Sequence, residues 1–354
     1  MSFPFLQPYF GLGSGLQTKN AAGGGGGGVG GWVELARTSN SALPDVSSLS
    51  NKRYYMILNS MNSSSSNPAI YWRLNNDSGS TYTRRASYDG GADGTGTSET
   101  YFTYLTDSAG GAYSIPYFAV GYLSNYSTKE KLLIAHSTHS RGGTGAGIWP
   151  SRAEYTGKWA NTSNSVSRIA LPSDSGTFAS DGELVVLGWD PADTHSNNFW
   201  TELASTTLTS ASSTLSSGTF TAKKYLWIQA YIITGTELNS LFRFNGDTAN
   251  NYSNRQSRNG GADSTNISIG HANIFSTYAV PAFINMFVVN VSSKEKLVIG
   301  HLIQRSTAGA GNAPNREEFV FKWANTSAQI TDATFTGSSG NIGSGSIIKV
   351  WGSD

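Results

Sequence analysis

Short runs of apolar and aromatic residues alternate with clusters of Gly, Asn, Ser and Asp along most of the chain. The clearest runs in the first half are Tyr54–Leu58, Ile70–Leu74, Tyr117–Leu123 and Lys131–His136. Such runs, separated by turn-forming residues, are typical of β-strands. No stretch combines the length and the periodicity of a convincing helix. The pattern therefore predicts an all-β protein.

One hairpin is especially clear in the second half of the chain. Phe283–Val291 is followed by the polar residues 292–295 and then by a second apolar run, Lys296–Gln304. Tyr117–Tyr126 and the polar residues 127–130 repeat the arrangement in the first half. We expect about seven or eight strands in each half, arranged as an antiparallel β-sandwich of jelly-roll type.

The two halves carry the same sequence blocks in the same order. Trp32-Val33-Glu34-Leu35-Ala36 returns as Trp200-Thr201-Glu202-Leu203-Ala204, and Lys158-Trp159-Ala160-Asn161-Thr162-Ser163 returns as Lys322-Trp323-Ala324-Asn325-Thr326-Ser327. Between them, Tyr82, Arg85 and Gly90-Gly91-Ala92-Asp93 recur as Tyr252, Arg255 and Gly260-Gly261-Ala262-Asp263. The order predicts two tandem copies of one domain, at residues 32–190 and 199–354, with a linker at 191–198.

Residues 1–31 have a different character. They contain two prolines among aromatic residues and then six glycines from Gly23 to Gly28. A glycine run of this kind is expected to be a flexible linker by itself. We interpret the segment as an attachment peptide that docks into another protein through Phe3, Phe5, Tyr9 and Phe10. The alternative is a leader without a binding role.

Composition excludes several classes of function. Charged residues are 13% of the chain, against about 25% in an average soluble protein. The net charge is +1 and the basic residues are scattered, so nucleic-acid binding is not expected. The absence of cysteine excludes disulfides, zinc–thiolate sites and cysteine catalysis. No apolar stretch reaches the length of about 18 residues that spans a membrane, and prolines interrupt the N-terminus, so neither membrane insertion nor an ordinary export signal is expected.

Four aspartates are the candidate cation ligands: Asp77 and Asp93, with their repeats Asp247 and Asp263. All four lie in turn sequences, where Asp caps its own loop backbone, so we favour a structural role. A calcium site is the alternative, and paired carboxylates for glycoside hydrolysis are a third interpretation. We predict no catalytic residue and no cofactor other than this calcium alternative.

Other repeated side chains favour structural roles as well. His136 and His301 lie on apolar strands, and no second shared histidine accompanies them, so packing is favoured over metal binding. Arg73 and Arg85, like their repeats Arg243 and Arg255, are expected to pair with the turn aspartates of their own domain, with a carbohydrate or phosphate site as the alternative. A tryptophan repeated in an identical block predicts a core anchor at Trp159 and Trp323.

The string Arg243-Phe244-Asn245-Gly246-Asp247-Thr248, continuing through Tyr252, Arg255 and Ser257 to Gly260-Gly261 and a later Lys-Glu-Lys-Leu strand, resembles a β-domain of uncharacterised structural proteins of tailed bacteriophages. The proline, aromatic and glycine-rich N-terminus resembles the virion-attaching segments of phage fibre and decoration proteins. The resemblance implies a non-enzymatic component of the virion surface, made in the host cytoplasm and bound to other virion proteins. It also implies a homo-oligomer, with a trimer as the leading expectation.

Two other classes of function remain open. A carbohydrate-binding, receptor-binding protein of lectin type would use loop residues such as Tyr113, Trp149 and His139. A polysaccharide-degrading enzyme would release reducing sugars from a host capsule.

Overall fold

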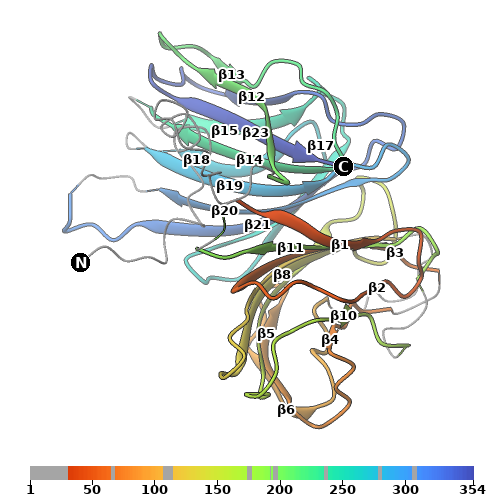
Figure 1. Cartoon of the computed structure of the whole chain (residues 1–354). Coiled ribbons are helices and arrows are strands. Elements are labelled where there is room, and N and C mark those ends of the chain that lie inside the picture. Colours follow the sequence, from red (N-terminus) through yellow and green to blue (C-terminus); the bar gives the residue numbers. More distant parts are fainter. Residues whose placement is uncertain are drawn as a thin grey trace, which may run out of the picture.

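The computed structural model describes residues 31–64, 68–106, 115–173, 178–191, 193, 198–234, 238–277, 281–304 and 309–354. Every named element in these ranges is a β-strand (Figure 1). The attachment residues Phe3, Phe5, Tyr9 and Phe10 lie outside the described residues, as does Tyr113.

Domain 1, the first repeat, consists of an eight-stranded antiparallel sheet packed on a three-stranded one. The order of the large sheet is β1 (Val33–Thr38), β11 (Glu183–Trp189), β3 (Tyr54–Asn62), β7 (Pro116–Ser124), β8 (Lys131–Ser140), β9 (Pro150–Trp159), β5 (Tyr82–Tyr88) and β6 (Gly94–Glu99). The order of the small sheet is β2 (Asp45–Val46), β10 (Ile169–Ala170) and β4 (Arg73–Leu74).

Domain 2, the second repeat, has the same order of corresponding strands. Its large sheet contains β12 (Thr201–Thr207), β23 (Ile347–Ser353), β14 (Tyr225–Ile232), β19 (Ala282–Val289), β20 (Lys296–Gln304), β21 (Asn315–Trp323), β16 (Tyr252–Arg258) and β17 (Ser264–Ile269). Its small sheet contains β13 (Thr214–Ser216), β22 (Ala333–Gly337), β15 (Leu238–Phe244) and β18 (Ala272–Thr277). In domain 1 a single bridge between Trp72 and Phe102 stands where domain 2 pairs β15 with β18.

The predicted fold class, two tandem antiparallel β-sandwiches, is confirmed. The chain passes between the two sheets of each domain at its beginning and end, whereas the middle strands, β7 to β9 and β19 to β21, follow one another as neighbours in the large sheet. The predicted hairpin is formed by β19 and β20, which pair in one uninterrupted register from Phe283↔Ile303 to Val289↔Leu297. The expected number of strands was too low, because strands of two residues such as β2, β4 and β10 leave no periodic pattern.

Each sandwich has its own apolar core between its two sheets. Trp159 and Trp323 each keep 1% of their surface exposed, which confirms both as core anchors. Their indole rings stack on Tyr82 and Tyr252, whose hydroxyls bond the backbone of the small sheet at Leu74 and Phe244. This link joins the large sheet of each domain to its small sheet.

A third apolar cluster lies between the two domains, which pack through the outer faces of their large sheets (Figure 1). Domain 1 contributes residues of β3, β7 and β11, among them Met56, Phe118 and Val185. Domain 2 contributes residues of β14, β19, β20 and β23, among them Trp227 and Phe287. The central strands are therefore buried on both faces, which explains their almost continuous apolar runs.

Candidate functional site

Asp77 and Asp247 cap the turns in which they lie and bind the core tryptophans. Asp77 accepts hydrogen bonds from the Trp159 indole at 2.7 Å and from the Gly79 amide at 2.8 Å. Asp247 accepts equivalent bonds from the Trp323 indole at 2.7 Å and the Ala249 amide at 2.9 Å. Burial acts to raise the pKa of Asp77, but these hydrogen bonds outweigh it and hold the pKa below its usual value. The same balance lowers the pKa of Asp247.

Asp93 and Asp263 have the same sequence context but different surroundings. Arg85 Nη1 lies 3.2 Å from Asp93 in domain 1, and Arg255 Nη1 lies 3.4 Å from Asp263 in domain 2, so the predicted pairing within each domain is confirmed. Arg152 of domain 1 also binds Asp263, through Nε at 3.0 Å and Nη2 at 2.7 Å. Asp263 is thus the centre of a contact between the domains.

The other repeated arginines bind backbone carbonyls, although the charge of Arg73 also helps to lower the pKa of the turn aspartate Asp77. Arg73 Nε lies 3.4 Å from the carbonyl of Thr100, which it binds as a donor, and Arg243 Nε donates to the carbonyl of Gly270 at 2.9 Å. These carbonyls lie on the segment that follows β6 or β17, which the arginines connect to the small sheet.

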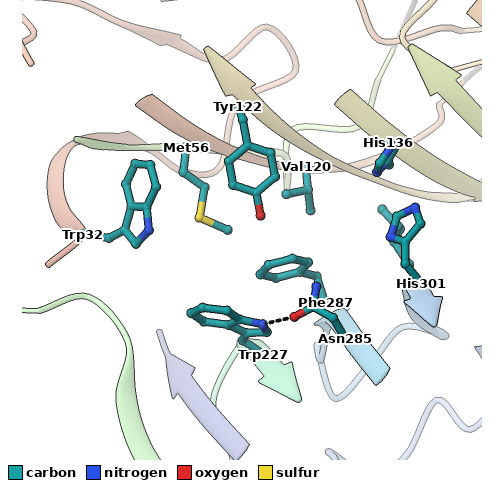
Figure 2. Close-up of a pocket in the computed structure, with 10 residues that line it drawn as sticks. Trp32, Met56, Val120, Tyr122, His136, Trp227, Asn285, Phe287 and His301 are labelled. Carbon is teal, nitrogen blue, oxygen red and sulfur yellow. Dashed lines mark hydrogen bonds between the residues drawn. The ribbon is translucent and has the colours of Figure 1, made fainter. Parts of the chain in front are cut away.

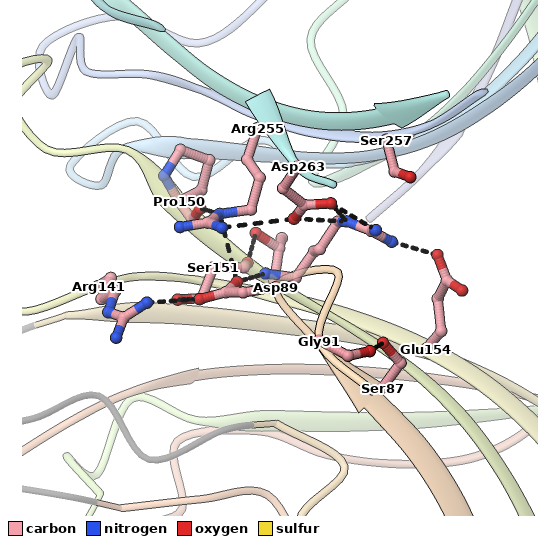
Figure 3. A network of polar contacts seen from close by, with 12 residues as sticks. Ser87, Asp89, Gly91, Arg141, Pro150, Ser151, Glu154, Arg255, Ser257 and Asp263 are labelled. Atoms are coloured by element: carbon pink, nitrogen blue, oxygen red, sulfur yellow. Dashed lines mark hydrogen bonds and ion pairs between the residues drawn. The ribbon is translucent and has the colours of Figure 1, made fainter. Parts of the chain in front are cut away.

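A polar network surrounds Asp263 at the domain boundary (Figure 3). Asp89 of domain 1 accepts bonds from the Arg152 amide at 3.0 Å and from Arg141 Nη1 at 2.6 Å. Arg255 Nε of domain 2 lies 3.3 Å from Asp89 and donates to the Pro150 carbonyl at 3.0 Å. Charges buried in this way are tolerated because each has an opposite charge and further hydrogen bonds.

A second polar contact between the domains centres on Glu295. Its carboxylate accepts bonds from Ser140 Oγ at 2.6 Å and from the Gly145 amide, both of domain 1. Lys322 Nζ lies 3.2 Å from Glu295 and 3.0 Å from Ser140. Although serine, lysine and glutamate are a nucleophile, a base and an acid, all three side chains are buried, so a substrate has no access to them.

Glu183 forms a third contact. Its carboxylate binds Tyr225 Oη at 2.8 Å and Lys224 Nζ at 2.9 Å in domain 2, and Arg37 Nη1 at 3.0 Å in domain 1. Burial acts to raise the pKa of Glu183, but hydrogen bonds from Ser39 and Lys224 outweigh it and lower the pKa. The carboxylate is therefore ionised at neutral pH and binds a positively charged side chain from each domain, Arg37 and Lys224.

A small cavity opens between the domains beside the two repeated histidines (Figure 2). Its volume is about 60 Å³, and its walls include Trp32 and Tyr122 of domain 1 and Trp227, Asn285 and Phe287 of domain 2. A cavity of this size holds a few water molecules, whereas ligand sites usually have about 300–1,000 Å³. The aromatic walls therefore contribute to packing between the domains.

His136 and His301 meet across the domain boundary with their ring centroids 4.4 Å apart. Burial lowers the pKa of His136 to about 4 and that of His301 to about 3. Both rings are therefore neutral at pH 7. The prediction of packed strand histidines holds, although the packing partner of each is its own repeat in the other domain.

The loop residues named for glycan binding fall into different environments. His139 is buried and stacks on Tyr117 with ring centroids 4.9 Å apart, so it is unavailable to a glycan. Trp149 keeps 38% of its surface exposed. Among the residues that the structure describes, no three His, Asp or Glu side chains are grouped to hold a metal ion. The same part of the chain contains no helix suited to crossing a membrane.

Sequence reasoning missed the residues that join the domains. No pattern pointed to Arg152 or Ser140, and Glu295 stood out only as part of the repeated Lys-Glu-Lys-Leu block. A usable pattern exists, because Gly145-Ala146-Gly147, Pro150, Arg152 and Glu154 recur as Gly309-Ala310-Gly311, Pro314, Arg316 and Glu318. Repetition of a glycine-rich loop with a fixed arginine indicates a role beyond connecting two strands.

Comparison with known proteins adds little to these contacts. No family model matches the chain, and no curated protein matches it. Among solved structures, the LG4-5 domains of the mouse laminin α1 chain are 12% identical over 91% of each chain, with a TM-score of 0.18. The attachment invasion locus protein Ail of Yersinia pestis is 6% identical, over 80% of this chain and 98% of its own, with a TM-score of 0.12. Scores this low give no basis for assigning a function.

Proposed function

We propose that the chain is a non-enzymatic structural protein of a tailed-bacteriophage virion, a surface decoration or fibre component attached through residues 1–31. The observation that carries the proposal is that the repeated polar side chains bind other parts of the same chain. Asp77 and Asp247 bind core tryptophans, while Asp263 and Glu295 join the domains. Side chains that carry chemistry elsewhere serve here to hold a rigid β-body together, as a virion surface component requires.

The sequence resemblance supplies the remaining support. It suggests that other virion proteins are the partners and that the virion surface is the location, after synthesis in the host cytoplasm. The apolar and aromatic side chains near the N-terminus are suited to docking, because buried aromatic anchors dominate binding energy in many interfaces. Several copies around a symmetry axis would strengthen weak peptide contacts through multivalency.

Deletion of residues 1–31 tests the proposal. We expect the shortened chain to keep a nearly normal melting temperature, because each remaining domain has its own apolar core, and to lose incorporation into particles. Particles that still incorporate the shortened chain would place the attachment surface on the β-domains and contradict the proposal.

A second candidate function, carbohydrate binding, is favoured by an aromatic cluster that only domain 1 has. Tyr71 stacks on Tyr101 at 5.1 Å between ring centroids, and Tyr104 meets Tyr71 edge-on at 5.2 Å. Tyr104 is 42% exposed and has a φ of 53°, an uncommon value for a bulky residue. Leu241 and His271 stand at the positions of Tyr71 and Tyr101 in domain 2.

A glycan array distinguishes the two functions. Binding that is lost in Tyr104→Ala and retained in Tyr231→Ala, an exposed tyrosine on domain 2, would support a carbohydrate site. The absence of binding by the intact chain to every glycan on the array would leave only the structural proposal.

A further inference from the structure

One face of domain 2 binds a loop of domain 1 mainly through the backbone of that loop. The Ser268 amide donates to the Ala146 carbonyl at 2.8 Å, and Ser253 Oγ donates to the Ile148 carbonyl at 2.9 Å. Arg255 Nε donates to the Pro150 carbonyl at 3.0 Å. Domain 2 thus binds three alternate carbonyls of the loop, those of residues 146, 148 and 150.

Charged side chains complete this contact. Glu295 accepts the Gly145 amide, and Lys322 pairs with Glu295. Asp263 binds Arg152 at the end of the loop. We call this surface the loop-docking face, and it consists of Ser253, Arg255, Asp263, Ser268, Glu295 and Lys322. We call residues 145–152 the docking loop.

Domain 1 has a second copy of the loop-docking face. The repeat places Thr83, Arg85, Asp93, Ser98, Glu130 and Lys158 at the corresponding positions. Ser98 and Ser268 share a left-handed backbone, with φ of 56° and 49°. The second copy therefore has the same kinds of side chain on the same backbone.

The two copies differ in what covers them. In domain 2 the exposed fractions of the side chains are 8% for Arg255, 4% for Asp263 and 0% for Lys322. In domain 1 they are 61% for Arg85, 50% for Asp93 and 40% for Lys158.

Apolar neighbours of the face differ in the same way. Leu132 and Ile134 are 55% and 45% exposed in domain 1, whereas their repeats Leu297 and Ile299 are 0% and 4% exposed. The copy in domain 1 is a complete but uncovered binding surface of mixed apolar and charged character.

Domain 2 has a second copy of the docking loop, residues 309–316, in the same conformation. Gly145 has a φ of 91° and Gly309 a φ of 97°. A turn closes from the Ile148 amide to the Gly145 carbonyl at 3.3 Å, and the Asn312 amide closes the same turn on Gly309 at 3.1 Å. A loop that already holds its bound conformation loses little entropy on docking.

This second docking loop is exposed within its own chain. Arg316 has 61% of its side chain exposed and pairs with Glu318 of the same strand, whereas its repeat Arg152 is 7% exposed and binds Asp263. Asp93, the repeat of Asp263, pairs with Arg85 of its own domain and keeps 50% of its side chain exposed. One loop and one face of the chain are thus joined, and the other loop and face are both exposed.

We propose that two copies of this chain associate head to tail, with residues 309–316 of one copy docking on the loop-docking face of domain 1 of the next. The contact is heterologous, because the two surfaces that meet are different, so it produces a ring where the rotation closes and a filament where it does not. It rests on the β-domains and not on residues 1–31, so it holds whether or not the N-terminal segment attaches the chain to a virion.

The contact between copies is weaker than the contact within the chain. His136 and His301 already pack on each other, so the sheet-to-sheet packing around them is not available a second time. Asn259 stands where domain 1 has Asp89, which removes one ion pair. The association is therefore expected to depend on protein concentration.

Engineered cysteines test the proposal directly, since the chain has none of its own. Ser98→Cys and Ala310→Cys are made in separate full-length chains, which are then mixed and mildly oxidised. The repeat of the bond between Ser268 and Ala146 would bring these two positions together, so we expect a disulfide-linked dimer in the mixture and much less in either variant alone. The matched control is one chain with both Ser268→Cys and Ala146→Cys, which should close within itself.

Charge exchange gives an independent readout by sedimentation at increasing concentration. Asp93→Arg should weaken association about tenfold or more by opposing Arg316, and adding Arg316→Asp to the same chain should restore it. Glu202→Arg, at an exposed position far from the docking surfaces in the fold, should change nothing. Three results would each overturn the proposal. The chain could sediment as a monomer at all concentrations, or its association could be unaffected by Asp93→Arg. The oxidised mixture of the two cysteine variants could also contain no more dimer than either variant alone.

Discussion

Single residues with the same sequence context have the same role in both repeats wherever that role is local. The bonds from the Trp159 and Trp323 indoles to Asp77 and Asp247 have equal lengths of 2.7 Å. Each aspartate lies in a turn, and each tryptophan ends a strand that borders it. The pair therefore connects a turn to the core by a bond to a charged acceptor, one of the stronger kinds of hydrogen bond.

Two substitutions separate the packing of this tryptophan from its hydrogen bond. Trp323→Ala should lower the free energy of unfolding by about 3–5 kcal/mol, because it removes a buried ring. Trp323→Phe keeps most of the ring packing and removes the N–H, so it should cost about 1.5–3 kcal/mol, the value of a hydrogen bond to a charged group. Denaturant titration measures both, and a Trp323→Phe variant as stable as the unmodified chain would show that the indole N–H contributes nothing.

Glycine at position 90 is required by a neighbour in the other domain as well as by its own backbone. Gly90 and Gly260 have φ of 72° and 71°, so alanine at either position costs about 1–2 kcal/mol in backbone strain. A β-carbon at Gly90 would also collide with the Asp263 carboxylate, whereas at Gly260 it would meet only the end of the Arg316 side chain. Gly90→Ala should therefore lower the melting temperature more than Gly260→Ala, and equal shifts would argue against close contact at Asp263.

At the scale of elements, the hairpin of β8 and β9 does more than extend the sheet of domain 1. Its loop crosses β16 and β17 of domain 2, and Arg152 at the start of β9 is buried against Asp263. The corresponding hairpin of β20 and β21 leaves Arg316 exposed. The β8–β9 hairpin therefore stabilises the contact between the domains, whereas its repeat, the β20–β21 hairpin, does not.

Alanine substitution of the two arginines measures this difference. Arg152→Ala leaves the buried Asp263 carboxylate without its main partner and should cost about 3–5 kcal/mol. Arg316→Ala, at an exposed site, should stay within about 0.5 kcal/mol of the unmodified chain. Chemical denaturation gives both values, measured at a protein concentration low enough that copies of the chain do not associate. Similar costs would mean that the domain contact does not depend on the ion pair.

The contact between β8 and β20 at the two histidines makes stability depend on pH. The pKa values of His136 and His301 are depressed by burial to about 4 and about 3, from about 6.5 in an unfolded chain. Between these limits the unfolded state binds more protons, so the free energy of unfolding falls as the pH falls. Glu318, whose pKa is raised by burial and by the nearby Glu154, acts in the opposite direction.

His301→Gln removes one of the titrating rings. The melting temperature of this variant should fall less steeply than that of the unmodified chain between pH 6.5 and about 4. Thermal melts at several pH values measure the slope. An unchanged slope would show that the histidine pair is not the group that titrates.

The whole molecule is one body of two sandwiches. The apolar cluster between the domains includes large side chains from both large sheets, and three polar contacts surround it. Domains joined by a small polar contact move independently, whereas a large apolar contact couples them.

Calorimetry tests this coupling. We expect the two domains to unfold in one cooperative transition, with a calorimetric enthalpy equal to the van't Hoff enthalpy. Arg152→Ala should begin to separate the transition into two. Two well-separated transitions in the unmodified chain would contradict a rigid contact between the domains.

The sequence by itself determined the features that depend on local pattern. Alternating apolar and turn residues determined the strands and the β19–β20 hairpin, and the repeated blocks determined that both halves share one strand order. The turn aspartates and core tryptophans followed from residue type and position. Each of these features depends on residues that are neighbours along the chain or within one sheet, and the sequence pattern shows such neighbours.

Only the tertiary structure decided which copy of each repeated surface is buried. Asp93 and Asp263 lie in the same Gly-Gly-Ala-Asp sequence, yet one side chain is 50% exposed and the other 4%. Local sequence cannot distinguish them, because it is the same in both. The difference arises from residues far away in the chain, at Arg152 and the docking loop, which reach domain 2 only because two large sheets bury their outer apolar faces against each other.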